Sequence, residues 1–223
     1  MTTTSKNTPR QKSVVADSLH KPSGSAVSEA ELYNRQLDPQ EPREWFIAIV
    51  EHQKYTVSCS QYIEKVFKEQ GCICFVPSKQ EERRYANRTR RMVTKFIIPR
   101  YIFVSGISER QAYDFVRNWP HVDMFMADRA MGRVTGRVRL AKISHREMLK
   151  FQQAIREVPS SDDILFTTEN LVFDEQIEVV RGGLKGLEGG YFQDSGDDFL
   201  VFMLGKLGNI KVRVSRKDCR LKK

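Results

Sequence analysis

The sequence lacks most features of secreted and membrane-spanning proteins. It has only four cysteines in 223 residues. No uninterrupted apolar run exceeds six residues, as in Phe199 to Leu204, whereas a helix needs ~20 apolar residues to span a bilayer. The opening residues, MTTTSKNTPRQK, lack the apolar segment of a signal peptide. We therefore expect a cytoplasmic protein without membrane contact.

The cysteines also lack the spacing of a zinc site. Cys72 and Cys74 form one C-x-C pair, and Cys59 and Cys219 are isolated. Tetrahedral zinc sites usually need two closely spaced ligand pairs. Because Cys72 and Cys74 alternate with apolar residues, we expect a strand with both thiols reduced, on one face and buried.

Catalytic motifs are missing as well. The histidines are scattered, with no Ser-His-Asp or HExxH arrangement and no P-loop after a strand. The glycine-rich GGLKGLEGG precedes strands, so no helix N-terminus is expected to hold phosphate there. We expect no enzyme activity, no cofactor and no metal.

The positive charge is concentrated in the middle of the chain. The net charge is +9, and residues 45–157 hold 21 basic against 11 acidic residues. Residues 158–210 sum to −7 and residues 211–223 to +6. Basic charge gathered on one domain is typical of a nucleic-acid-binding surface, although a merely solvated basic face is the alternative.

The pattern predicts a tail, two domains and a linker. Residues 1–43 are polar and proline-containing, which predicts a flexible tail. Residues 44–157 predict an α+β domain with a mainly antiparallel sheet, and residues 169–223 predict a small β-barrel made of IEVV, FLVFML and NIKVRV. Residues 158–168, with Asp162 and Asp163, predict a solvated linker that tethers the domains loosely.

Within the first domain, apolar periodicity and caps locate each element. We expect YIFV to continue the second strand of a basic hairpin beyond Pro99, and Ser108 to cap a helix. The expected strands are 45–50, 72–77, two hairpin strands (QEERRY and MVTKFIIP), 101–104 and 122–126, and the expected helices are 55–70, 108–118 and 144–156.

In the second domain an alternating strand is followed by glycines that permit a sharp turn. This pattern resembles the SH3-like KOW barrel of transcription and ribosomal proteins. Gly183 and Leu184 stand where Pro and Phe are common in that motif. The matching residues are Gly182, Lys185, Gly186 and Gly189.

WFIAIV, a helix, a strand ending in Pro77, a basic hairpin and PRYIFV follow one another along the first domain. In this order they resemble the NusG amino-terminal domain. The family's Pro-Gly-Tyr-x-Phe-Val element is matched at Pro99, Tyr101, Phe103 and Val104, while Arg100 replaces the glycine. With the KOW motif, the resemblance covers about residues 45–223.

Three further segments of the chain are FMADR, ISHREMLKF and EERRYANRTRR. In these segments it resembles the UpxY-type antiterminators of that family and, more distantly, RfaH. The resemblance implies a factor that binds the clamp helices of RNA polymerase and suppresses pausing and termination on capsular or surface polysaccharide operons. It also implies polymerase contacts at Tyr101, Phe103 and Phe125, for which an ordinary sheet core is the alternative.

The resemblance further implies contact with the non-template DNA strand or nascent RNA. Trp119 could stack on an unpaired base or pack under a helix end, and the hairpin arginines could bind phosphates or simply be solvated. The candidate DNA-binding residues are Lys54, Gln61, Lys65, Arg83, Arg84, Arg88, Arg90, Arg91, Lys95, Asn118, Trp119 and His121.

A different class of function stays open. A KOW-type RNA- or ribosome-binding module without polymerase activity would use the basic segment 211–223. In either case we expect a monomer. We also expect the second domain to keep its strands, because β-branched residues and clustered glycines disfavour a helix across 176–205. The polymerase-binding site is then expected to be open.

Overall fold

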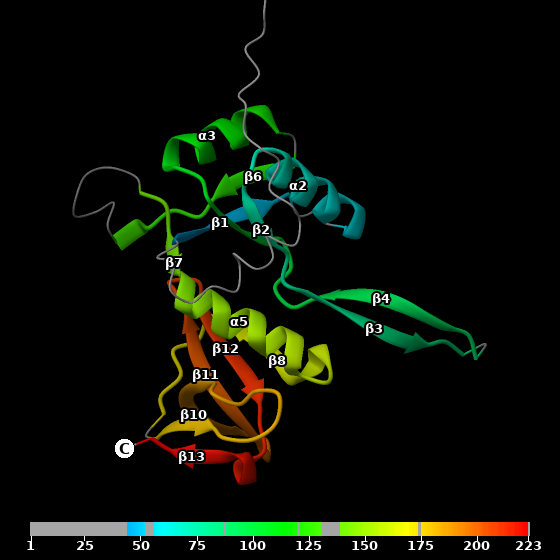
Figure 1. Ribbon diagram of the computed structural model, residues 1–223, viewed down its shortest axis with the longest axis vertical. Coiled ribbons are helices and arrows are strands. Elements are labelled where there is room, and N and C mark those ends of the chain that lie inside the picture. The colour runs from blue at the N-terminus through cyan, green and yellow to red at the C-terminus, as the bar shows by residue number, and fades with distance from the viewer. Residues whose placement is uncertain are drawn as a thin grey trace, which may run out of the picture.

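The computed structural model of the chain describes residues 44–51, 56–86, 88–119, 121–130, 139–173 and 175–222. The predicted tail and Lys54 lie outside these residues. A five-stranded sheet lies at one end, a six-stranded sheet at the other, helix α5 (His145–Glu157) between them, and a hairpin points sideways (Figure 1).

The first sheet is antiparallel and has β1 at its centre. Its order is β2-β5-β1-β6, and β7 also pairs with β1. The WFIAIV run fills β1 because it is buried on both faces: Trp45 and Ile47 join one apolar core, whereas Phe46 and Ala48 join the other. The strands are β1 (Glu44–Val50), β2 (Ile73–Phe75), β5 (Tyr101–Ser105), β6 (Val122–Phe125) and β7 (Lys142–Ser144).

Helices cover both faces of this sheet. The core on the Phe46 face is completed by α2 (Val57–Glu69) and α3 (Glu109–Asn118), and the core on the Trp45 face by α5. The predicted Ser108 cap is confirmed, with a capping box to Gln111, and Ser144 caps α5 in the same way. The two predicted buried thiols are also confirmed, and burial raises the pKa of Cys72 to about 11.

The basic hairpin consists of β3 (Ser78–Arg84) and β4 (Arg90–Phe96), which pair only with each other. The prediction that β5 continues β4 is wrong, because the chain turns before β5. Arg100 has a φ of 74°, the left-handed conformation that explains the family's glycine. Its Nε donates to the carbonyl of Val50 at 3.0 Å, which helps to hold the turn.

The second sheet has six antiparallel strands in the order β13-β9-β10-β11-β12-β8. Within the described residues its end strands do not pair, so the expected closed barrel is not observed. The prediction of strands without helix across 176–205 is confirmed. The strands are β8 (Ile164–Thr167), β9 (Gln176–Val179), β10 (Glu188–Asp194), β11 (Asp197–Leu204), β12 (Gly208–Arg213) and β13 (Cys219–Leu221), with short 3-10 helices η2 (Ser161–Asp163) and η3 (Arg216–Asp218).

The expected solvated linker is a structured segment instead. Its second half forms β8, which pairs with β12 and so belongs to the second sheet. Asp162 lies 3.5 Å from Lys95 and Asp163 lies 3.3 Å from Arg213. The acidic residues that suggested loose tethering therefore join the hairpin base to the second sheet.

The two sheets share one apolar core across α5. It runs from Trp45 and Phe103 of the first sheet through Phe151 of α5 to Leu200 and Ile210 of the second sheet. The prediction of loosely tethered domains is wrong for this structure, because local sequence did not reveal the second packing face of α5. None of the described helices is long and apolar enough to cross a membrane.

Candidate interaction surfaces

An apolar row lies across the first sheet, beyond the part that α5 covers. Ile49 pairs with Tyr101 on one side and with Met124 on the other. Directly opposed residues of antiparallel strands share a face, so the three side chains point the same way. Ile49 and Tyr101 are half-buried and Met124 is 50% exposed. We call Ile49, Tyr101 and Met124 the apolar row.

The other two predicted polymerase contacts are not at this surface. Phe103 shares the face of Tyr101, as predicted, but it is 0% exposed and its ring centroid is 5.8 Å from that of Phe151. Phe125 is 6% exposed on the opposite face, where it meets Phe67 of α2. In this conformation both residues are core, and only Tyr101 of the predicted set reaches the surface. Sequence reasoning missed Ile49 and Met124, which only the strand register reveals.

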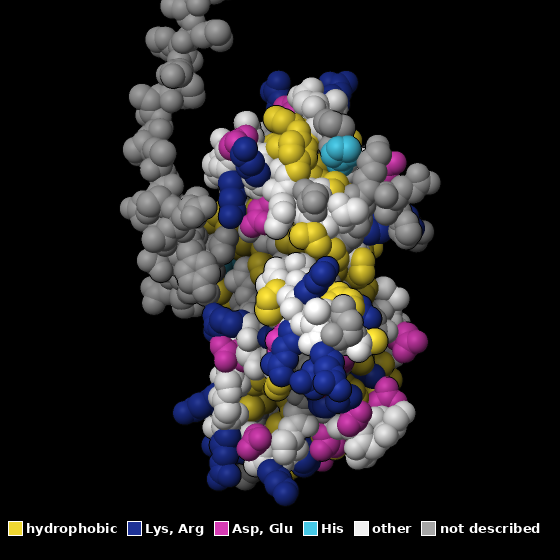
Figure 2. Space-filling model, turned by 90° about the vertical axis from the view of Figure 1, so that its right-hand side faces the viewer, with side chains coloured by type: hydrophobic (Ala, Val, Ile, Leu, Met, Phe, Trp, Pro, Cys, Tyr) yellow, Lys and Arg dark blue, Asp and Glu magenta, His cyan; other side chains and the backbone are white. Residues whose placement is uncertain are grey.

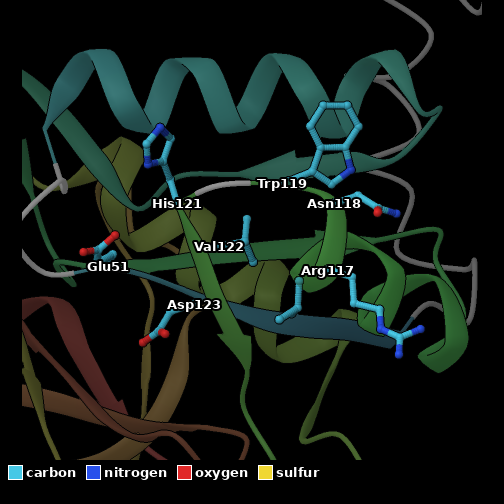
Figure 3. Close-up of a pocket in the computed structure, with 8 residues that line it drawn as sticks. Glu51, Arg117, Asn118, Trp119, His121, Val122 and Asp123 are labelled. Carbon is cyan, nitrogen blue, oxygen red and sulfur yellow. The ribbon is translucent and has the colours of Figure 1, made fainter.

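A pocket of about 390 Å³ lies at the turn between α3 and β6. In Figure 3 the Trp119 and His121 side chains point towards helix α2, which crosses the top of the view. The His121 ring is 6.1 Å from that of Tyr62 on α2. The lining residues are Glu51, Val116, Arg117, Asn118, Trp119, His121, Val122 and Asp123.

The structure thus brings together two separate groups of predicted DNA-binding residues. Gln61 and Lys65 are exposed on α2: Gln61 is the residue before Tyr62, and Lys65 lies about one helical turn after it. Asn118 is exposed at the pocket. Trp119 is half-buried, and its ring centroid lies 6.4 Å from that of Phe115. One part of the Trp119 side chain therefore packs under the end of α3, and the other part is exposed. His121 has a φ of 90°, and its buried Nδ1 has no hydrogen-bond partner among the described residues.

The hairpin carries arginines on both of its faces. Arg83 lies opposite Arg91, and Arg84 lies opposite Arg90. All four are exposed, as is Arg88 at the turn. Figure 2 shows Lys and Arg side chains gathered where the hairpin points towards the viewer. Like charges directly opposite each other destabilise a hairpin, so this arrangement favours an anionic partner.

Lys95 differs from the hairpin arginines because its charge is used within the fold. Its Nζ lies 3.0 Å from Glu81 and 3.5 Å from Asp162. The backbone N–H of Ser161 also donates to Glu81. This hydrogen bond, followed by Lys95, lowers the pKa of Glu81. We therefore remove Lys95 from the phosphate-binding candidates and assign it to the hairpin base.

Residues 43–152 match the family described as "Transcription termination factor nusG" (NusG). This part of the chain is therefore similar to a NusG domain. The match supports a role in transcription elongation or termination, and it spans the apolar row, the pocket and the hairpin. Among curated proteins, none matches the chain. The described residues hold no group of His, Cys, Asp and Glu that could bind a metal ion.

The glycine-rich loop of the second sheet contacts helix α5. Gly182 and Gly186 have φ values of 77° and 85°, a backbone conformation that glycine adopts more readily than other residues. A side chain on Gly189 would collide with the backbone of Val201. The carbonyl of Lys185 accepts a hydrogen bond from Nε2 of Gln153 on α5 at 3.1 Å. The loop is therefore part of the contact between the two sheets.

The basic end of the chain is neutralised by the acidic segment before it. Each ion pair has an N–O distance between 2.7 and 3.3 Å, and all lie on the second sheet or its edges. Paired charges leave little excess potential for phosphates. The pairs are Lys211–Asp194, Arg213–Asp163, Arg213–Asp197, Arg216–Glu175, Arg220–Glu178 and Lys222–Glu188.

Proposed function

We propose that the protein is a transcription antitermination and elongation factor whose NusG domain binds the clamp helices of RNA polymerase. The observation that carries this proposal is the apolar row, which no described element covers completely: Ile49 and Tyr101 are half-buried and Met124 is 50% exposed, while α5 packs on the neighbouring part of the same face. An exposed apolar strip bounded by packed structure is typical of a protein-binding surface.

The row suits a helical partner. Tyr101 supplies an aromatic anchor with a polar tip, and Met124 supplies a flexible apolar side chain that can adapt to a helix surface. Arg100 and Asp123 flank the row, with 4.0 Å between Nη2 and the carboxylate. Apolar anchors with a charged rim are the usual anatomy of a specific interface.

Suppression of pausing follows from differential affinity. A factor that binds the elongating conformation of polymerase more tightly than the paused one raises the elongating fraction by the ratio of the two affinities. In this proposal no chemical step is performed by the protein, and its effect depends only on which polymerase conformation it prefers.

Nucleic acid is the second partner in the proposal. The α2 side chains and the α3–β6 pocket would contact the exposed non-template strand, and the hairpin arginines would contact phosphates. The resemblance to UpxY-type factors suggests capsular or surface polysaccharide operons as targets. It also suggests that the second sheet is a KOW-type module.

The alternative, an RNA- or ribosome-binding module without polymerase activity, gains no support from the second sheet. Its expected RNA surface, segment 211–223, has Lys211, Arg213, Arg216, Arg220 and Lys222 in ion pairs. A surface neutralised in this way would bind a polyanion weakly.

Affinity purification of the full-length protein from its native lysate, after nuclease treatment, separates the two functions. We expect the core polymerase subunits to co-purify, and we expect the purified protein to shorten pauses in single-round transcription. Ribosomal RNA recovered in a parallel sample without nuclease, with no polymerase in either sample, would contradict the proposal. Transcript sequencing with and without the protein then identifies the target operons.

A further inference from the structure

One face of the hairpin tip combines an aromatic ring with two guanidinium groups. Arg83 and Arg91 are directly opposite each other on β3 and β4. Their guanidinium carbons lie 5.6 Å and 6.0 Å from the centroid of the Tyr85 ring. The Tyr85 side chain is 39% exposed. The three side chains therefore form one patch, which we call the Arg–Tyr–Arg face.

This face has no visible role within the fold. The described residues between 82 and 92 are all exposed, so the tip packs on no core. Neither Arg83 nor Arg91 forms an ion pair with a carboxylate in the described part of the chain. On the other face, by contrast, Arg90 lies 3.4 Å from Glu82. The charge on the Arg–Tyr–Arg face is left for an external anion.

The chemistry of the face favours an unpaired nucleic-acid strand. Arginine binds phosphate with well-defined geometry, and an aromatic ring stacks on a base. Stacking requires a base whose flat face is free, and the bases of a duplex are already stacked on their neighbours. Two guanidiniums beside one ring match the repeating unit of a single strand, in which a phosphate lies on each side of a base.

We propose that the Arg–Tyr–Arg face binds an unpaired nucleic-acid strand, with Tyr85 stacked on one base and Arg83 and Arg91 on the adjacent phosphates. The contacts involve phosphates and a base face, which DNA and RNA share, so the site does not distinguish the two sugars. This inference deepens the nucleic-acid contact of the proposed function by naming its ligand.

The test uses the full-length protein without polymerase and labelled oligonucleotides of about 12 nucleotides, as single-stranded DNA, single-stranded RNA and duplex DNA. Fluorescence anisotropy at several salt concentrations gives each dissociation constant. The key variant is Tyr85→Leu, which keeps an apolar side chain but removes the ring. We expect it to weaken binding of both single strands at least fivefold and to leave duplex binding nearly unchanged.

A charge-matched pair of variants separates this site from general electrostatics. Arg83→Gln with Arg91→Gln removes two charges from the Arg–Tyr–Arg face, and Arg84→Gln with Arg90→Gln removes two charges from the other face. Both pairs should lower the salt dependence, because fewer counterions are released. We expect the first pair to weaken single-strand binding several times more than the second.

Three results would overturn the inference. They are equal losses for the two pairs, an unchanged affinity in Tyr85→Leu, and a DNA-to-RNA affinity ratio well above about threefold. Circular dichroism confirms folding of each variant. Because the apolar row is untouched, all variants should still bind polymerase, so failure of this inference can be told apart from failure of the proposed function.

Discussion

Helix α5 and the Arg–Tyr–Arg face of the hairpin both carry charged side chains, but only those of α5 bond to the second sheet. Lys150 of α5 donates to the carbonyl of Glu188 at 3.1 Å, and Glu147 accepts from the N–H of Gly205 at 3.3 Å. At the tip, Arg83 and Arg91 have no carboxylate partner in the described residues. The charged side chains of α5 therefore help to hold the two sheets together, whereas those of the Arg–Tyr–Arg face are available to an external ligand.

The same contrast appears within the hairpin itself. Its base is held by Glu81 and Lys95, which bond to the segment that leads into the second sheet. Its tip begins about two residue pairs further along the strands, and the described side chains there are all exposed. The hairpin is therefore anchored at one end and free at the other, which suits a structural element that presents a binding face away from the body.

The largest effect should come from breaking the packed region. Phe151→Ala removes a ring that is fully buried against Phe75 and Phe103, and we expect it to cost about 3–5 kcal/mol of unfolding free energy. Because the two sheets share one core, urea should unfold the protein in a single transition, and the variant should shift its midpoint. Circular dichroism and tryptophan fluorescence should report the same midpoint. Two separate transitions, with only one shifted, would show that the sheets fold independently.

A smaller effect should come from the contact between the second sheet and β7. A Cβ on Gly205 would come within 2.9 Å of Ile143 and 3.0 Å of the Lys142 carbonyl, while one on Gly196 would meet nothing within 4 Å. Both glycines have positive φ, so alanine is strained at either position. We expect Gly205→Ala to cost about 1–3 kcal/mol more than Gly196→Ala in thermal or urea unfolding. Equal losses would contradict the docked arrangement.

The hairpin base should give a pH-dependent effect. The pKa of Glu81 is lowered by the Ser161 N–H and by Lys95, so its stabilisation is fully present above the unfolded-state pKa and is lost as pH falls through the folded-state pKa. We expect Glu81→Gln to cost about 1–2 kcal/mol at neutral pH. The difference in unfolding free energy between Glu81→Gln and wild type should become smaller as the pH is lowered. Glu82→Gln, at the exposed neighbouring position, should stay within about 0.5 kcal/mol at every pH.

Much of the fold could be predicted where local chemistry decides it. WFIAIV forms β1 because six consecutive apolar residues suit a strand that is buried on both faces. Ser108 and Gln111 mark the start of α3 because their side chains cap the first turn. The 176–205 segment forms strands because its glycines and β-branched residues disfavour a helix.

The parts that could not be predicted depend on partners distant in sequence. β10 contains Gly189 and Gly190, which read as a turn, but their missing side chains make room for Val201 and Phe173. β8 follows two aspartates that suggested solvent, although one of them pairs with Arg213. The docking of the second sheet depends on polar residues of α5, such as Gln153, whose partners lie about 30 residues away.

The candidate sites show the same division. The hairpin arginines stand out by their charge, whereas Trp119 and Tyr101 became candidates through the family resemblance. The apolar row needed the register of three strands, because Ile49 and Met124 come from segments that are far apart in sequence. Burial then separated Phe103 and Phe125 from the surface, which strand alternation alone could not do.

The most direct test of the account is the affinity of Tyr101→Ala for core RNA polymerase, measured by titration against full-length wild type. Tyr113→Ala is the control, since Tyr113 is an exposed tyrosine (46%) on helix α3, which covers the opposite face of the sheet. We predict that Tyr101→Ala weakens binding by about 1 kcal/mol or more, as truncation of an aromatic anchor does, and that Tyr113→Ala leaves it unchanged. A folded Tyr101→Ala protein that binds polymerase as tightly as wild type would contradict the account.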